Sequence, residues 1–301
     1  MLSGEAMTDQ AVSNDASLLT EMQSWSQGHI DSDGVSLRYF RAPLDTASPK
    51  PPLVFVHGFT DCALYFARAA EAFAKDWDVV AYDARGHGLS DRVGTNFDDE
   101  KRVADLLAVV TQLGLDRPAM IGHSMGGSTI AKFAAEYPDR TRGVVLEDPA
   151  WFEPTDAELA ASVDVRAQRT AAWLEWIVAI QTKSSDEAIA MRTNDEPAWN
   201  PVDIALSTDG RLQIDVAVFG PFLPAWSPWR ERVVAFSCPA LLLLGDRADR
   251  GAIITEALAV EAAASNPLLR WHQVAGAGHH IRYDQFPTYL DVVGKFLDQL
   301  R

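Results

Sequence analysis

The sequence predicts an α/β fold, in which helices cover both faces of a mostly parallel, eight-stranded sheet and a further helical segment is inserted. Three observations favour this fold. Short apolar runs of strand length alternate with helical patterns, one of these runs ends in a glycine-flanked serine that opens a helix, and the alternation stops across one long aromatic segment. Such alternation is typical of a parallel sheet covered by its connecting helices.

Composition limits the class of protein. At 301 residues, 48% of them hydrophobic, the chain can bury a substantial core. Its formal net charge of −16 argues against a nucleic-acid partner, whose phosphates would repel it. The two cysteines, Cys62 and Cys238, lack metal-ligand spacing and favour a reducing compartment. No run approaches the ~20 apolar residues of a spanning helix and no secretory pattern is visible, so we expect a cytoplasmic protein without membrane contact.

Eight short segments have the pattern of strands, and they follow a polar leader at residues 1–24. They are residues 28–30, 35–40, 53–56, 78–82, 118–122, 143–146, 239–244 and 268–274. The first two flank turn residues and predict an antiparallel hairpin. Several of the others are apolar throughout, as expected of strands that are covered on both faces.

Helical patterns lie between these strands. They are predicted at residues 64–74, 97–113, 125–137, 256–264 and 288–300. In the second of these, Val103, Leu106 and Val110 recur on one face of a helix. Pro138 stops the third.

The alternation breaks after residue 148. From residue 149 to 233 the chain is helical, rich in proline and aromatic, and it holds six of the nine tryptophans. We interpret this stretch as an inserted helical cap. The core is then made of residues 25–148 and 234–301.

The serine turn, residues 118–127, carries the pattern G-x-S-x-G at Gly122, Ser124 and Gly126. An apolar strand precedes it and a helical pattern follows it, which is the setting that this pattern requires. The sharp turn strains the serine backbone and lifts its hydroxyl clear of the sheet, and residues packed beside it must lack side chains. Ser124 is therefore the candidate nucleophile.

Four motifs, in this order, carry a family resemblance. They are His57-Gly58 with Phe59, Asp83-x-Arg85-Gly86-His87-Gly88-x-Ser90, Gly122-x-Ser124-x-Gly126-Gly127, and Gly276-Ala277-Gly278-His279. With them the chain resembles the α/β-hydrolase superfamily over nearly all of its length beyond the leader. The resemblance implies a serine hydrolase that cleaves a carboxylic ester or lactone through an acyl-enzyme, without metal or cofactor.

A serine hydroxyl needs a base, and histidine is the side chain whose ordinary pKa of about 6.5 suits that exchange. His279 follows the last strand in a glycine-rich loop and comes last in the chain, as the order serine, acid, histidine requires. We predict His279 as the base, in preference to its neighbour His280. His57 and His87 lie in motifs whose histidines more often bond backbone groups.

The carboxylate that orients the base has three candidates. The loop after the strand at residues 239–244 offers Asp246 and Asp249. The commoner family spacing would place the acid at Ala248, whereas similar loops place it directly after the strand, which favours Asp246. Asp249 remains its competitor. Asp148 is a third option, although its plainer role is to cap the point where the chain enters the cap through Pro149.

The remaining site predictions concern the oxyanion and the substrate. The resemblance assigns the oxyanion donors to the backbone N–H groups of Phe59 and Met125. We expect the cap to present an apolar underside to a small hydrophobic or aromatic substrate. The candidates for substrate contact are Trp151, Trp199, Phe222 and Trp226, with Phe219 and Trp229 as further possibilities.

Three points of this interpretation stay open. At helical spacing, Trp173 and Trp176 are more often part of the cap core than of a pocket. Asp61 is a candidate for substrate contact, although a helix N-cap ahead of Leu64 is its plainer role. The same catalytic groups also serve amide, carbamate and carbon–carbon hydrolysis and perhydrolysis. A ligand receptor on this scaffold belongs to another class, against which an intact serine, histidine and acid argue. Monomer and homodimer are both open.

Overall fold

The computed structural model describes residues 24–44, 48–152, 164–220 and 228–301. Its centre is one sheet of eight strands in the order β1-β2-β4-β3-β5-β6-β7-β8. The strands are β1 Ser26–Ser32, β2 Val35–Arg41, β3 Pro52–Val56, β4 Asp78–Tyr82, β5 Ala119–His123, β6 Gly143–Glu147, β7 Ala240–Gly245 and β8 Leu269–Val274. β1 and β2 form the predicted antiparallel hairpin, β2 joins β4 antiparallel, and every other pair is parallel. The predicted fold class is confirmed.

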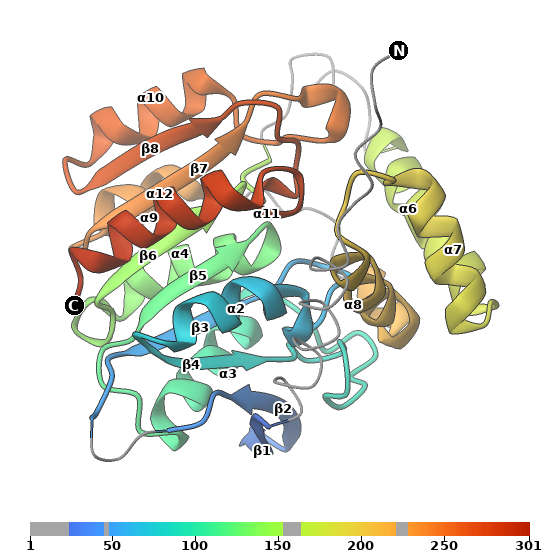
Figure 1. Ribbon diagram of the computed structural model, residues 1–301, viewed down its shortest axis with the longest axis horizontal. Coiled ribbons are helices and arrows are strands. Elements are labelled where there is room, and N and C mark those ends of the chain that lie inside the picture. The colour runs from blue at the N-terminus through green and yellow to red at the C-terminus, as the bar shows by residue number, and fades with distance from the viewer. Residues whose placement is uncertain (1–23, 45–47, 153–163, 221–227) are drawn as a thin grey trace, which may run out of the picture.

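Helices cover both faces of the sheet because successive strand residues point to opposite sides. In β3, Phe55 belongs to the core cluster beneath helices α2 (Ala67–Ala74) and α12 (Phe286–Asp298), which lie in front of the sheet in Figure 1. Its neighbour Val54 belongs to the cluster on the other face. That face is covered by α3 Asp99–Gln112, α4 Met125–Glu136, α9 Trp229–Ala235 and α10 Glu256–Ser265.

The parallel register brings the carboxyl ends of the central strands to one edge. Gly122 of β5 is opposite Val56 of β3 on one side and Leu146 of β6 on the other. The loops that follow these strands therefore meet at the same edge, where α/β sheets bind ligands. A short helix, α11 (Ile281–Asp284), which the sequence pattern did not predict, also lies there.

Three helices stand over this edge and form the cap as we use the word below. They are α6 Asp164–Gln181, α7 Ser185–Asp195 and α8 Pro201–Gln213, to the right of the sheet in Figure 1. Their starts follow ordinary helix chemistry: the Ser184 side chain caps α7 reciprocally with Glu187, and Asn200 caps α8 just before Pro201. α8 packs on α6, α7 and the 3₁₀ turn Ala63–Phe66 of the core.

The interval that the sequence assigned to the cap is not structurally uniform. α9, at its end, packs on α4 and α10 and belongs to the helical layer of the sheet. The predicted leader lies outside the described residues except for Ser24. Within the described ranges, no helix is both long enough and apolar enough to cross a membrane.

Candidate active site

Ser124 occupies the sharp turn between β5 and α4. Its backbone has φ 52° and ψ −115°, in the positive-φ region that non-glycine residues rarely adopt. The turn is held from below, because the Ser124 N–H donates to the Glu147 carbonyl at 3.0 Å. A Cβ at Gly126 would lie 2.0 Å from the Val56 carbonyl oxygen, and one at Gly122 would lie 2.5 Å from the Gly126 carbonyl oxygen. Glycine is therefore required at both flanking positions.

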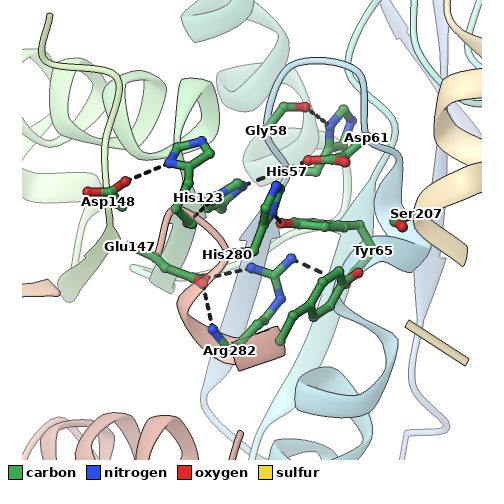
Figure 2. A network of polar contacts seen from close by, with 12 residues as sticks. His57, Gly58, Asp61, Tyr65, His123, Glu147, Asp148, Ser207, His280 and Arg282 are labelled. Atoms are coloured by element: carbon green, nitrogen blue, oxygen red, sulfur yellow. Dashed lines mark hydrogen bonds and ion pairs between the residues drawn. The ribbon is translucent and has the colours of Figure 1, made fainter. Parts of the chain in front are cut away.

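His279 and Asp148 form a close pair beside this turn. The Nδ1 atom of His279, in the loop after β8, lies 2.6 Å from Oδ2 of Asp148, the residue that follows β6. Asp148 is fully buried and accepts two further hydrogen bonds, from the backbone N–H groups of Ile253 and Ile254, both at 2.9 Å. Figure 2 shows Asp148 at one edge of a polar network to which His123, Glu147 and Arg282 also belong. The pair satisfies the requirement for a carboxylate that orients the imidazole.

This arrangement corrects the predicted acid. Asp246 is exposed and its carboxylate accepts the Gly276 N–H at 2.8 Å, while Asp249 pairs with Arg247 at 2.6 Å. Neither contacts His279. The physical reason is the path of the loop after β7, which is exposed at residues 246–250 and returns through Gly251 at φ 80°; Asp249 lines the cavity at its rim, but its carboxylate is taken up by Arg247. On its return it directs the backbone N–H groups of Ile253 and Ile254 toward Asp148, while the Arg250 carbonyl accepts the His279 N–H at 3.2 Å.

Ser124 and His279 line one cavity of about 490 Å³ between the sheet edge and the cap. The core contributes Phe59, Thr60 and Asp61 from the loop after β3, and His280 beside His279. The cap contributes aromatic and charged side chains, which are considered below. A volume of this size accommodates a small organic molecule.

Comparison with known proteins agrees with this fold. Residues 51–179 match the family model described as the alpha/beta hydrolase fold. Esterase YbfF of Escherichia coli is 25% identical over 82% of this chain and 93% of its own length. N-formylmaleamate deformylase of Pseudomonas putida is 28% identical over 90% of this chain and 96% of its own. The enol-lactonase structure from Burkholderia xenovorans superposes with a TM-score of 0.71 at 22% identity, covering 90% of this chain and 100% of that one.

The chain has the α/β-hydrolase fold. It is an enzyme of the hydrolase class, as the relatives that match most of its length also are.

Two histidines of this α/β-hydrolase act on loop shape, as predicted. His57 is fully buried, with Nδ1 2.7 Å from the Gly58 carbonyl oxygen and Nε2 accepting the Ala84 N–H at 2.9 Å. Burial lowers the pKa of His57 to about 4 and that of His87 to about 3. Both rings are neutral at pH 7 and hold the loops around the site.

A buried ion pair, which the sequence patterns did not reveal, fixes the loop of His279 from below. The carboxylate of Glu147, at the end of β6, accepts one hydrogen bond from the Arg282 guanidinium at 2.7 Å and one from the Arg282 backbone N–H at 3.1 Å (Figure 2). The guanidinium also lies 3.7 Å from the centre of the Tyr65 ring. His123, beside the nucleophile, contacts the His279 carbonyl oxygen through Nε2 at 3.0 Å. These contacts connect β5, β6 and α11 of the hydrolase.

The structure places the predicted aromatic contacts differently. Trp199 lines the cavity as expected, and Trp173 and Trp176 line it as well, although helical spacing favoured the cap core for them. The prediction for Trp151 is wrong, because this side chain is buried and does not line the cavity. Its ring stacks on Trp229 with centroids 5.0 Å apart, in the core beneath α4 and α9.

The remaining aromatic and oxyanion candidates are placed as follows. Phe219 is buried against Phe59, with ring centroids 4.8 Å apart. Phe222 and Trp226 lie outside the described residues. Met125 is the first residue of α4, so its N–H has no partner within the helix. The assignment of oxyanion donors to Phe59 and Met125 stays a prediction.

Charged residues of the cavity are the largest departure from the sequence analysis. Arg192 of α7 and Arg211 of α8 both line it and are 7% and 5% exposed. Asp61 also lines it, with Oδ1 3.4 Å from Nη1 of Arg211, so its predicted role as an N-cap is wrong. The Ala63 N–H donates instead to Asp83 at 2.6 Å. Because side-chain direction in the cap depends on how its helices pack, no local pattern marked the two arginines.

Proposed function

We propose that this hydrolase cleaves a carboxylic ester or lactone through an acyl-enzyme on Ser124, with His279 as the base and Asp148 as the carboxylate that orients it. The observation that carries the proposal is the 2.6 Å contact between His279 Nδ1 and Asp148 Oδ2 beside a serine held at positive φ. A serine, a histidine and a buried carboxylate in this relation are the groups that acyl transfer needs.

The mechanism follows from the hydrogen bonds of His279. Because Nδ1 bonds Asp148, Nε2 carries the lone pair that accepts a proton. His279 takes the Ser124 hydroxyl proton as Oγ attacks the carbonyl carbon, and the proton then passes to the leaving alkoxide as the acyl–oxygen bond breaks. A water molecule, deprotonated by the same ring, attacks the acyl-enzyme and releases the acid and free Ser124.

Two backbone N–H groups, those of Phe59 and Met125, are proposed to stabilise the oxyanion in both steps. Removing one such donor typically costs about 3 kcal/mol of transition-state stabilisation. Because these donors belong to the backbone, their contribution cannot be tested by side-chain truncation. Ser124 and His279 are the accessible positions for mutation.

The second candidate for the bond that is cleaved is the carbon–nitrogen bond of an N-acyl substrate. The observation that favours it is the match, over 90% of this chain, to a protein named N-formylmaleamate deformylase. Esterase YbfF, at 25% identity, favours the ester. The same nucleophile and base serve both bonds, and they differ only in whether His279 protonates an alkoxide or an amine as it leaves.

The test is hydrolysis of a series of para-nitrophenyl esters, from acetate to decanoate, by the wild type and by Ser124→Ala and His279→Ala. We expect nitrophenol release from the wild type, an acyl adduct on Ser124 in its intact mass, and loss of turnover in both variants with their melting temperatures retained. Turnover by Ser124→Ala at the wild-type rate would refute the proposed nucleophile. If every ester is inert but the matching N-acyl anilides are hydrolysed, the second candidate replaces the first.

A further inference from the structure

Two arginines stand together inside the cavity. Arg192 comes from α7 and Arg211 from α8, and their guanidinium carbons lie at the same distance, 5.8 Å, from the centre of the Trp176 ring. Arg192 is also 5.4 Å from the centre of the Trp199 ring. Both cations therefore contact the same tryptophan, and Arg211 lies beside the loop that follows β3.

The buried positive charge of Arg192 has few partners. Within the described parts of the chain its guanidinium makes no hydrogen bond, and its one ion-pair partner is Asp195, 3.9 Å away with a side chain 51% exposed. Its Nε is buried without an acceptor. A guanidinium carries five N–H donors, and a buried charge that lacks hydrogen bonds is costly. Arg192 is thus held ready for an acceptor that the described chain does not supply.

The side chain of Arg211 is held in place, but its charge and its N–H donors are only partly paired. Its Nη1 donates to the Ser207 carbonyl at 2.6 Å and lies 3.4 Å from Asp61 Oδ1, while its Nε is also buried without an acceptor. α8 approaches the β3 loop so closely that a Cβ at Gly210 would lie 2.8 Å from the Asp61 backbone. This packing places Arg211 directly beside the loop of the proposed oxyanion donor.

The charges of the cavity are consistent with a missing anion. Burial lowers the pKa of Arg192 first, and the neighbouring Arg211 lowers it further. Of the other carboxylates that line the cavity, Glu196 and Asp284 both accept from Arg250, at 2.7 and 2.9 Å, and Asp249 pairs with Arg247 at 2.6 Å. Asp61 lies within ion-pair distance of Arg211 and of no other arginine that the structure describes. Two like charges in one buried cavity repel each other, and a bound anion would offset both this repulsion and the cost of their desolvation.

We propose that Arg192 and Arg211 bind a free carboxylate of the substrate, so that the hydrolysed compound is a small ester or lactone whose acyl part carries a second acidic group. The inference deepens the proposed function and rests on it. The planar fork of a guanidinium matches a carboxylate in two-point hydrogen bonds. Trp176 and Trp199, which line the same cavity, then contact the carbon chain between the carboxylate and the bond to be cleaved.

The experiment compares two esters of equal chain length, para-nitrophenyl hydrogen glutarate, which has a free carboxylate, and para-nitrophenyl valerate, which has none. We expect the wild type to prefer the charged ester at least 10-fold in kcat/KM. In Arg192→Gln this preference falls by roughly 10- to 100-fold, the usual effect of losing hydrogen bonds between charged groups. Lys183→Gln, which removes an exposed cap cation outside the cavity, is the matched control and keeps the preference.

A second variant guards against a folding defect. Arg192→Lys retains the charge without the fork and is expected to keep part of the preference. A wild type that hydrolyses both esters equally well, or an Arg192→Gln enzyme that loses both activities to the same extent at an unchanged melting temperature, would overturn the carboxylate site. In either case Ser124-dependent ester hydrolysis would still support the proposed function.

Direct binding covers the case in which neither ester is cleaved. Calorimetric titration of the wild type with glutarate, and separately with inorganic phosphate, is expected to show tighter binding of glutarate, weakened 10- to 100-fold in Arg192→Gln. Binding of this kind in an enzyme inert toward esters would retain the anion site and refute the esterase. Tighter binding of phosphate, or glutarate binding that does not respond to Arg192→Gln, would refute the carboxylate assignment.

Discussion

At the scale of single residues, the function of this hydrolase depends on which carboxylate serves His279. Asp148 is buried and bonded to His279 Nδ1, whereas Asp246 and Asp249 are exposed and bonded elsewhere. Only a desolvated carboxylate that contacts the imidazole fixes its tautomer and stabilises its charged form. The three positions therefore differ sharply in the effect that substitution should have.

Asp148→Asn should lower kcat by about 10⁴-fold, the loss seen when such an orienting carboxylate becomes an amide. Asp246→Asn and Asp249→Asn serve as matched controls, and each should stay within about 3-fold of the wild type, because an exposed carboxylate contributes little. Steady-state hydrolysis of the preferred ester measures all three. A loss in Asp246→Asn comparable to that in Asp148→Asn would reinstate the carboxylate that the sequence favoured.

Gly126→Ala should abolish folding or activity. The added methyl would lie 2.0 Å from the Val56 carbonyl oxygen, which belongs to the backbone of the central strand and cannot move aside. Gly34→Ala is a comparison at a glycine with open space but positive φ, where the expected cost is about 1 kcal/mol. Soluble yield, circular dichroism and ester turnover separate the two, and a folded, active Gly126→Ala enzyme would contradict the turn geometry described above.

At the scale of elements, the site depends on how β6 and α11 are joined. The pair Glu147–Arg282 lies at the junction of these elements and is 0% and 1% exposed, so neither charge has access to water when its partner is removed. Burial raises the pKa of Glu147, while Arg282 acts against that shift. The loop of His279 is anchored on this pair.

Arg282→Met should lower the free energy of unfolding by about 3–5 kcal/mol, because it leaves Glu147 buried without its partner. The double variant Glu147→Gln with Arg282→Met should recover part of that loss, since no charge then remains buried. Urea denaturation of the wild type and the variants at pH 7 measures the differences. Equal stability of Arg282→Met and the wild type would show that the pair does not hold these elements together.

At the scale of the whole molecule, several buried histidines make stability depend on pH. Burial is the largest cause of the lowered pKa in His57, to about 4, and it also lowers that of His87, His123 and His280. The unfolded chain binds these protons near pH 6.5, whereas the folded protein binds them only at much lower pH. The stability they contribute is present in full above about pH 7 and is lost as the pH falls toward 4. Asp61, Asp83 and Glu147, whose pKa burial raises, act in the opposite direction.

Unfolding measured at pH 7 and at pH 5 should show this loss. From His57 alone we expect about 2 kcal/mol less stability at pH 5, given a pKa that moves from 6.5 in the unfolded chain to about 4 in the folded one. His57→Gln cannot titrate, so its stability should fall less over the same interval, whatever its absolute value. An equal fall in wild type and His57→Gln would contradict the neutral, buried state of this histidine.

The sequence by itself determined the sheet, the hairpin and the positions of Ser124 and His279. These features are local: apolar runs specify buried strands, and the glycines beside Ser124 are needed by one sharp turn whatever surrounds it. The order of the motifs along the chain then placed His279 at the edge of the sheet where Ser124 lies. None of this required knowledge of contacts between distant segments.

The tertiary structure alone decided the acid and the character of the pocket. Asp148, Asp246 and Asp249 are similar in the sequence, since each follows a strand. Only the relative depth of the loops after β6 and β7 selects Asp148. Likewise, a helical pattern does not show which face of α7 or α8 is turned toward the core, so Arg192 and Arg211 could not be assigned to the cavity. Both outcomes depend on packing between segments far apart in the chain, and that packing has no signature in the local sequence.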